Sequence, residues 1–310
     1  MITDESGAGE RLAGLRVGIV GLGLMGGSLA LALRGRVAGL IGVERQGDTR
    51  QMALRAGVVD EALEALTPDA PPIDLLVLAT PVRVILDTLG RLPALRPGGC
   101  AVIDLGSTKR AVLAAMDTLP PSFAAIGGHP MCGKETSGLA SASADLFRGQ
   151  TFILCRGRRT TPALEATALA LVAAIDARPL VMDAADHDAI VAAVSHLPAV
   201  LSAALMRLAA DERQWAVSAS GFRDVARLAG SDPRMMLDIL LTNRDALLGA
   251  LDGYEAELAV LRQALTEGDE AALGDWLAGA QLRYAAYRRH KSAEHLHLPG
   301  GGPPPPGKIA

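Results

Sequence analysis

The stretch VGIVGLGLMGGS at residues 17–28 decides the fold of this chain. Its apolar start predicts a buried β-strand, and its end opens a helical stretch. Between them stand Gly21, Gly23 and Gly26 with the spacing G-x-G-x-x-G. A strand, a glycine-rich turn and a helix in this order are the context in which this fingerprint binds a dinucleotide.

Each glycine of this turn has its own physical role. Gly21 permits the tight turn, Gly23 lets the backbone approach a pyrophosphate, and Gly26 lets the helix pack against the strand. The free N–H groups at the helix start favour phosphate. We expect these residues to contact the cofactor: Gly21, Leu22, Gly23, Leu24, Met25 and Gly26. A glycine-rich turn without a ligand is the alternative.

An acidic residue follows the second predicted strand, residues 39–43. Glu44 stands at the carboxyl end of that strand, where a carboxylate accepts hydrogen bonds from the ribose hydroxyls of NAD and repels a 2′-phosphate. Arg45 can instead hold the phosphate of NADP. We therefore expect NAD, with NADP possible.

Further apolar runs alternate with helical stretches. They predict strands at residues 74–79, 101–105, 124–126 and 151–155, with a short strand at residues 58 and 59. This alternation favours a Rossmann-type, doubly wound parallel sheet. Thr80 and Pro81 close the first of the four longer runs, so their loop is expected to lie over the cofactor.

The composition becomes mostly helical after residue 157. Residues 184–210 are apolar on more than one side, as in a helix buried in a dimer. One short strand is expected near residues 178–182. We predict a flexible N-terminus at 1–14, a dinucleotide-binding domain at 15–157, an all-α dimerisation domain at 158–292 and a disordered tail at 293–310.

The composition also bounds the partners. A length of 310 residues suits two domains, and a net charge of −4 gives no reason to expect nucleic acid or an anionic membrane as a partner. No apolar run reaches membrane-spanning length, and the polar N-terminus is not a signal peptide. Cys100, Cys132 and Cys155 lack metal-ligand and C-x-x-C spacing. We expect free thiols, a cytoplasmic location and no metal site.

Three polar residues follow neighbouring strands of the predicted sheet. His129 comes after a Gly-Gly pair, near the expected nicotinamide, where it can exchange a proton at neutral pH. A structural histidine is the alternative. Ser107 can bond His129 or a substrate hydroxyl, or it can cap a helix. Lys109 can bond the Ser107 loop or the cofactor, or it can lie on a helix surface. Cys132 has no activating neighbour and is expected to fill space.

Two polar groups interrupt the helical half. Ser195 and His196 lie within an apolar stretch, as pocket-lining residues or as a buried structural pair. Arg223 and Arg227 flank Asp224, and a guanidinium pairs with a carboxylate in a bidentate way. A surface salt-bridge cluster is the alternative.

Together these motifs resemble the prephenate/arogenate dehydrogenase family of tyrosine biosynthesis. The motifs occur in the family's order: GLGLMGGS at 21–28, D-x-x-S-x-K at 104–109, GHPM-x-G at 128–133, SG at 137–138, SHLP at 195–198 and GF-x-D-x-x-R at 221–227. The match runs from about residue 15 to residue 287. The His-Pro-Met and Gly-Phe elements are its specific part.

The resemblance implies a homodimer that decarboxylates prephenate oxidatively to 4-hydroxyphenylpyruvate. In such enzymes the histidine at position 129 accepts the C4 hydroxyl proton, while hydride passes to the nicotinamide and the ring carboxylate leaves as CO2. Ser107 would orient His129 and bond the hydroxyl. The residues implied to bind substrate are Arg227, Ser195, His196, Asp224 and Lys109.

One position departs from the family pattern. Many prephenate-using members have His-Leu-Pro-His, and Ala199 replaces the second histidine here. Arogenate, which carries an amino group in place of the keto oxygen, is therefore an alternative substrate. After residue 287 only a short polar tail follows, which does not fit the regulatory or mutase domain of some relatives. Feedback by tyrosine, if present, is then expected at the active site.

Two other functions are compatible with the glycine fingerprint. A two-domain NAD(P) oxidoreductase of the 3-hydroxyacid dehydrogenase or imine reductase type would not need Gly-His-Pro-Met together with Gly-Phe-Arg-Asp. A dinucleotide-sensing dimer without catalysis would tolerate the loss of His129 or Ser107, and both residues are present.

Overall fold

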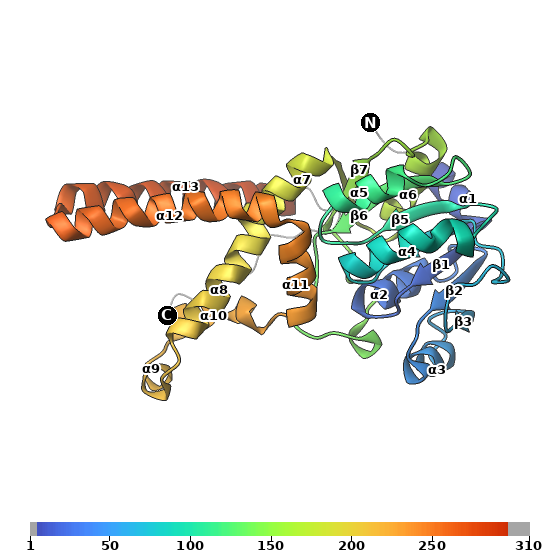
Figure 1. The fold of residues 1–310 in the computed structure, drawn as a ribbon, viewed down its shortest axis with the longest axis horizontal. Helices are drawn as coiled ribbons and strands as arrows, with labels where there is room; N and C mark the ends of the chain where they lie inside the picture. The colour runs from blue at the N-terminus through green and yellow to red at the C-terminus, as the bar shows by residue number, and fades with distance from the viewer. Residues whose placement is uncertain (1–4, 297–310) are drawn as a thin grey trace. The chain divides into compact units, whose positions relative to one another are not determined.

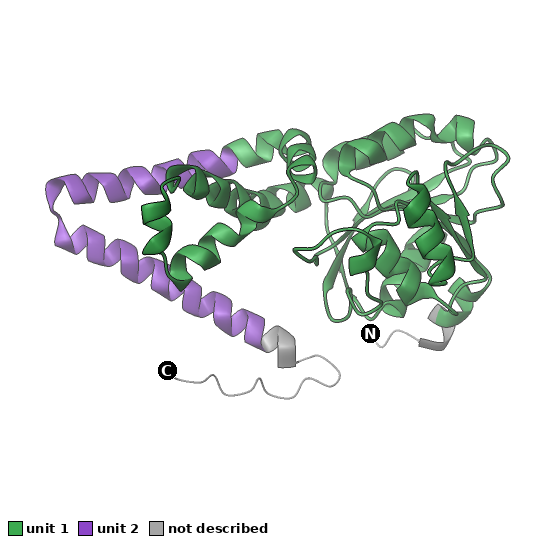
Figure 2. Cartoon of the chain, turned by 90° about the horizontal axis from the view of Figure 1, so that it is seen from below, with its two compact units in different colours: residues 1–248 green, residues 249–310 purple. Residues whose placement is uncertain are grey.

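The computed structural model describes residues 5–296, and the chain divides into two compact units. The first is Met1–Leu248 and the second is Gly249–Ala310, coloured green and purple in Figure 2. The first unit contains every residue of the candidate site. The second contains the end of α12 (Arg244–Glu267) and α13 (Glu270–Leu296), where the Trp276 Nε1 donates to Glu257 Oε2 at 3.0 Å.

An eight-stranded sheet, part of which is labelled in Figure 1, organises the first unit. Its strand order is β3-β2-β1-β4-β5-β6-β7-β8. The strands are β1 (Arg16–Val20), β2 (Gly39–Val43), β3 (Glu61–Leu63), β4 (Leu75–Leu78), β5 (Ala101–Asp104), β6 (Ala124–Pro130), β7 (Thr151–Arg156) and β8 (Arg178–Val181). Neighbouring strands run parallel except β6 and β7, which are antiparallel. The predicted Rossmann-type sheet is confirmed, with one reversed strand.

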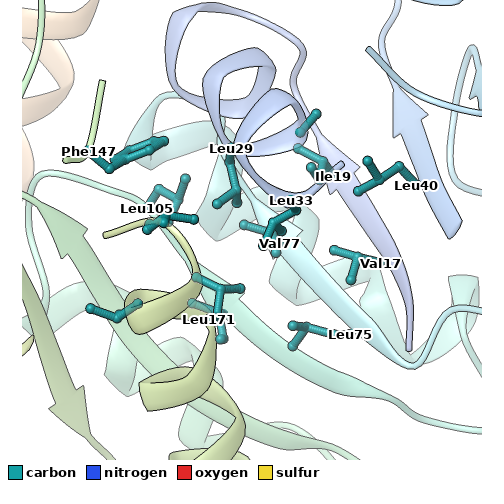
Figure 3. Close-up of a cluster of buried hydrophobic side chains, with 14 of the residues drawn as sticks. Val17, Ile19, Leu29, Leu33, Leu40, Leu75, Val77, Leu105, Phe147 and Leu171 are labelled. Carbon is teal, nitrogen blue, oxygen red and sulfur yellow. The ribbon is translucent and has the colours of Figure 1, made fainter. Parts of the chain in front are cut away.

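The core lies on both faces of the sheet. Leu75 and Val77 of β4 belong to the cluster shown in Figure 3, while Leu76 and Leu78 point into a second cluster. Burial on both faces explains why this strand is a continuous apolar run. The helices that follow the strands are α2 (Leu24–Leu33), α3 (Gly47–Arg55), α4 (Val82–Leu95), α5 (Arg110–Asp117) and α6 (Pro162–Ala174).

Further helices of the first unit come after β8. They are α7 (Ala184–Val191), a π-helical turn (Ala192–His196), α8 (Leu197–Leu208), α9 (Glu212–Ala216), α10 (Ser220–Ala226), a 3-10 turn (Arg227–Gly230), α11 (Pro233–Thr242) and the start of α12. The π-helical turn directly precedes Pro198 at the start of α8. Proline has no N–H to donate to the preceding turn, which accounts for the irregular hydrogen bonding there.

The structure differs from the expected domain limits at both ends of the sheet. Residues 5–13, expected to be flexible, form helix α1 (Glu5–Ala13), and its Leu12 is 1% exposed in the core. At the other end, β8 follows the domain limit expected at residue 157 and yet extends the sheet, because it pairs with β7. Helix α6 also follows that limit, and its Leu164 and Leu171 belong to the core beside the sheet. Residues 1–4 and 297–310, parts of the expected flexible ends, lie outside the described residues.

Two smaller expectations also differ. The strand expected at residues 58 and 59 lies instead at β3, while Val58 and Val59 are buried in the turn before it. The second concerns apolar length. The helical run Ala184–Leu208 is long and apolar enough by composition to cross a membrane, contrary to expectation. Its first half, however, carries His187, Asp188 and His196 in buried hydrogen bonds, as a helix of the folded domain does.

Candidate active site

The glycine turn after β1 has the geometry that a dinucleotide requires. Gly21 has φ of +92°, and a Cβ at Gly26 would lie 1.9 Å from the Gly21 carbonyl oxygen, so both positions need glycine. A Cβ at Gly23 would meet nothing within 4 Å. The middle glycine thus faces open space beside the start of α2, where a pyrophosphate can approach the backbone.

Glu44 lies directly beside this turn. Its carboxylate accepts hydrogen bonds from the backbone N–H of Leu22 at 3.2 Å and of Gln46 at 3.0 Å. Arg45 is exposed, and its carbonyl oxygen accepts from Arg50 Nη1 at 2.7 Å. An acceptor at the end of β2, next to the glycine turn, fits the ribose of a dinucleotide.

The loop after β4 packs against the same turn. A Cβ at Gly21 would lie 2.7 Å from Thr80 Cγ2, and Pro81 begins α4 as its N-cap. Within the described residues, the buried Thr80 hydroxyl oxygen has no hydrogen-bond partner. The predicted cofactor residues from the ends of β1, β2 and β4 therefore meet at one edge of the sheet, as the residues of a dinucleotide site do.

His129 lies within β6, opposite Ile153 of β7, because the strand continues through Pro130. A Cβ at Gly128 would lie 2.6 Å from the Asp104 carbonyl oxygen, which explains the glycine before the histidine. The imidazole is half-buried. Its Nδ1 lies 2.8 Å from Nε2 of His187, and the two rings meet edge to face.

Lys109 forms a buried ion pair beneath His129. Its ammonium contacts Asp104 and donates to the Gly128 carbonyl oxygen at 2.8 Å, and both charged side chains are 0% exposed. Asp104 also accepts from the backbone N–H of Gly106 at 2.8 Å. The expectation of a substrate contact at Lys109 does not match this position, because its charge is used inside the protein.

A second carboxylate, Asp188 of α7, connects the helical part to the sheet. It accepts from the backbone N–H of Lys109 at 2.7 Å and of Arg110 at 2.9 Å, and so caps α5 from another helix. It also accepts from His187 Nδ1 at 2.7 Å. Because these bonds hold the carboxylate ionised against the effect of burial, the pKa of Asp188 is lowered.

The polar pair in the helical half divides into an exposed and a buried residue. Ser195 is exposed, whereas His196 is 2% exposed and its Nδ1 lies 3.1 Å from Asn243 Nδ2. The same amide nitrogen donates to the Asp188 carbonyl oxygen at 2.8 Å. Burial lowers the pKa of His196 to about 4, so the ring is neutral at pH 7. Ala199 is buried on the next turn.

The Gly-Phe motif contributes an exposed ion pair. Arg227 Nη1 lies 3.0 Å from Oε1 of Glu135, which follows β6. The Asp224 carboxylate pairs with a different arginine: its Oδ1 lies 3.9 Å from Nε of Arg223. Among the described residues, no hydrogen bond joins Ser107 to His129; the partner of His129 is His187. Sequence reasoning missed His187 and Asp188, although an adjacent His-Asp pair in an apolar stretch was a visible signal.

The electrostatics of the site favour a neutral His129. Burial lowers the pKa of His129 well below its usual value, and the Lys109 charge lowers it further, with His187 and His196 adding to the effect. A neutral imidazole is ready to accept a proton. Burial raises the pKa of the Cys132 thiol to about 11, which agrees with its expected role as filler.

Comparison with known families covers most of the chain. Residues 29–181 match the family described as "Prephenate dehydrogenase, nucleotide-binding domain", and residues 183–279 match "Prephenate dehydrogenase, dimerization domain". A prephenate dehydrogenase from Bacillus subtilis (strain 168) is 32% identical over 263 residues, which cover 81% of this chain and 70% of that protein.

Solved structures of a prephenate and an arogenate dehydrogenase are similar to this chain over most of its length. A prephenate dehydrogenase from A. aeolicus, solved in complex with hydroxyphenyl propionate and NAD+, is 27% identical with a TM-score of 0.80, covering 89% of this chain and 99% of that one. The arogenate dehydrogenase of Synechocystis is 32% identical with a TM-score of 0.76, covering 88% of this chain and 100% of that one.

Proposed function

The chain belongs to the prephenate dehydrogenase family, and we propose that it converts prephenate to 4-hydroxyphenylpyruvate by NAD-dependent oxidative decarboxylation. The observation that carries this proposal is His129, a neutral imidazole on β6 at the sheet edge where a dinucleotide fits. A base in that position can remove a hydroxyl proton while hydride leaves the same carbon.

The cofactor is NAD, which accepts the hydride when it is bound. Gly23 leaves space for its pyrophosphate, and Glu44 offers a carboxylate to its ribose hydroxyls. The same carboxylate repels a 2′-phosphate, which favours NAD over NADP. Arg45, exposed beside Glu44, is the residue through which NADP would bind instead.

His129 supplies the proton chemistry. Its Nε2 takes the proton of the C4 hydroxyl as hydride leaves C4. The bond between C1 and its carboxylate then breaks, CO2 leaves, and the electron pair flows through the ring to the C4 oxygen. That oxygen takes the proton back from His129, and the ring is aromatic. The gain of aromaticity drives the reaction, so the protein mainly supplies orientation and a base.

Arg227 holds a substrate carboxylate in this proposal. Its side chain is 57% exposed and already binds a carboxylate, that of Glu135. A substrate carboxylate would replace Glu135 and form the bidentate pair that a guanidinium favours. Ser195 is exposed near the start of α8 and can contact the same substrate, while Ser107 and Asp224 remain candidates for polar contacts with it.

A homodimer is the proposed assembly, working in the cytoplasm. The match of residues 183–279 to a dimerization domain supports it. Apolar side chains on the helical part support it as well, because Val194, Leu208 and Leu241 are 65%, 79% and 55% exposed. The three cysteines are free thiols, as in proteins of a reducing compartment. Light scattering after size-exclusion chromatography tests the dimer.

Arogenate is the second candidate substrate. Ala199 leaves α8 without the imidazole that many prephenate-using members place there, and the likeness to an arogenate dehydrogenase agrees with this. The deciding experiment supplies prephenate or arogenate with NAD or NADP and follows the absorbance of the reduced nicotinamide. Turnover of prephenate with NAD supports the proposal. Turnover of arogenate alone moves the activity to that substrate, and no turnover with any pair overturns both.

A further inference from the structure

His129 is the first member of a line of three hydrogen-bonded side chains. Its Nδ1 lies 2.8 Å from His187 Nε2, and His187 Nδ1 lies 2.7 Å from Asp188 Oδ1. His187 and Asp188 are both 0% exposed, whereas His129 is half-buried. The line therefore runs from the sheet edge, where the cofactor fits, into the interior between β6 and α7.

We assign the protons along this line from the hydrogen-bonding capacity of each group. An ionised carboxylate can only accept, so His187 Nδ1 carries the hydrogen that Asp188 binds. With its one hydrogen on Nδ1, His187 has a bare Nε2, which accepts the hydrogen on Nδ1 of His129. In turn, a neutral His129 has its lone pair on Nε2. The nitrogen left bare is the one that has no hydrogen-bond partner among the described residues.

Asp188 is the anion that His187 contacts, because the other titratable groups near this line are paired elsewhere or neutral. At the N-cap of α5, the Lys109 ammonium binds Asp104 and the Gly128 carbonyl oxygen. From the turn before α8, His196 is bonded to Asn243 and is neutral at pH 7. Asp188 itself is fixed by two backbone N–H groups of α5. A carboxylate held this firmly gives His187 one orientation only.

We propose that His187, held by Asp188, is the positioning residue of His129. It keeps the proton of His129 on Nδ1 and the lone pair on Nε2, the nitrogen that accepts the substrate proton. A single polar partner in this position raises the rate of the proton step without touching substrate. This inference rests on the proposed function, because it assigns His129 as the base.

Nitrogen NMR of the wild-type protein tests the tautomer directly. With six histidines in the chain, selective labelling gives few signals, and the His129→Ala variant identifies those of residue 129. The expected spectrum at pH 7 shows His129 with a protonated Nδ1 and a bare Nε2. A protonated Nε2 with a bare Nδ1 would overturn the proposal.

Two variants of His187 test the role in turnover. His187→Leu removes the acceptor, and kcat is expected to fall on the order of 100-fold, the scale of a mispositioned general base, with KM and NAD affinity unchanged. His187→Gln places an amide oxygen where Nε2 accepts, and most of the lost kcat is expected to return. Equal losses in both variants would contradict a positioning role.

A double variant separates positioning from a general structural effect. If His187 acts through His129, adding His187→Leu to His129→Ala lowers kcat no further. Losses that multiply would show an independent effect and overturn the proposal. The wild-type assay is the reference: no turnover by the wild type refutes the proposed function, whereas normal turnover by His187→Leu beside an inactive His129→Ala refutes only the present inference.

Discussion

Arg227 and Glu135 form an exposed ion pair, with Nη1 and Oε1 separated by 3.0 Å. The pair joins the end of α10 to the segment after His129, six residues further along the chain. In the proposed function this guanidinium exchanges an internal carboxylate for one on the substrate. Removing it should therefore weaken substrate binding more than it weakens the fold.

Arg227→Ala is expected to raise KM about 30-fold, since a charge-assisted hydrogen bond is worth roughly 2 kcal/mol. Steady-state kinetics with prephenate and NAD measure the change. Arg223→Ala is the matched control. The Arg223 side chain is 79% exposed, and its ion pair with Asp224 is long, at 3.9 Å, so its loss should change little. Equal KM values for both variants would assign Arg227 to the surface alone.

Two glycines of the turn after β1 should respond differently to alanine. Gly23→Ala adds a methyl group into open space, so the protein should fold normally and bind NAD more weakly. Gly26→Ala puts a Cβ 1.9 Å from the Gly21 carbonyl oxygen, which forces α2 away from β1 and lowers the melting temperature. Calorimetry of NAD binding and thermal unfolding separate the two effects. Unchanged NAD affinity in Gly23→Ala would show that the pyrophosphate does not bind beside Gly23.

The buried ion pair should be costly to break from one side. Lys109→Met leaves the Asp104 carboxylate without its partner in the core, and the free energy of unfolding is expected to fall by about 3–5 kcal/mol. The double variant Asp104→Asn with Lys109→Met should recover part of this loss, because no uncompensated charge remains. Urea unfolding measures both. A loss in the double variant as large as in Lys109→Met would mean that packing, not charge, is responsible.

The contrast between Glu44 and Lys109 shows what the sequence could predict. Glu44 follows a strand at a fixed spacing from the glycine turn, so local patterns sufficed to place it beside that turn. For Lys109, the family resemblance implied a substrate contact. The residue is instead buried against Asp104 and β6, and no local sequence pattern reveals these contacts. Likewise, His129 was recognised from its motif, but its partner His187 lies 58 residues away and is brought there by the packing of α7. Long-range polar pairs are decided by tertiary structure.

The lowered pKa of His129 predicts the pH dependence of turnover. Burial and the Lys109 charge lower the pKa of this imidazole well below its usual value of 6.5, so the ring is still neutral at pH 6.5. The base is then already available under acidic conditions, and kcat/KM should stay constant as the pH falls through 6.5. Stopped-flow assays over the acidic range measure this, with NAD affinity determined at each pH as the control. A decline that begins above pH 6.5 would contradict a base that stays neutral under acidic conditions.

His196 should make the fold sensitive to acid. Its pKa is about 4 in the folded protein against 6.5 for an ordinary histidine, so the unfolded chain binds more protons between these values. Its neutral state favours the fold above pH 6.5, and this contribution is lost as the pH falls toward 4, by about 3 kcal/mol. His196→Gln keeps a polar group beside Asn243 but cannot be charged. Urea unfolding at pH 7 and pH 4 should show a smaller acid loss in His196→Gln than in the wild type. Equal losses would assign the acid sensitivity to the carboxylates, Asp188 first among them, since its lowered pKa also favours the fold only while it is ionised.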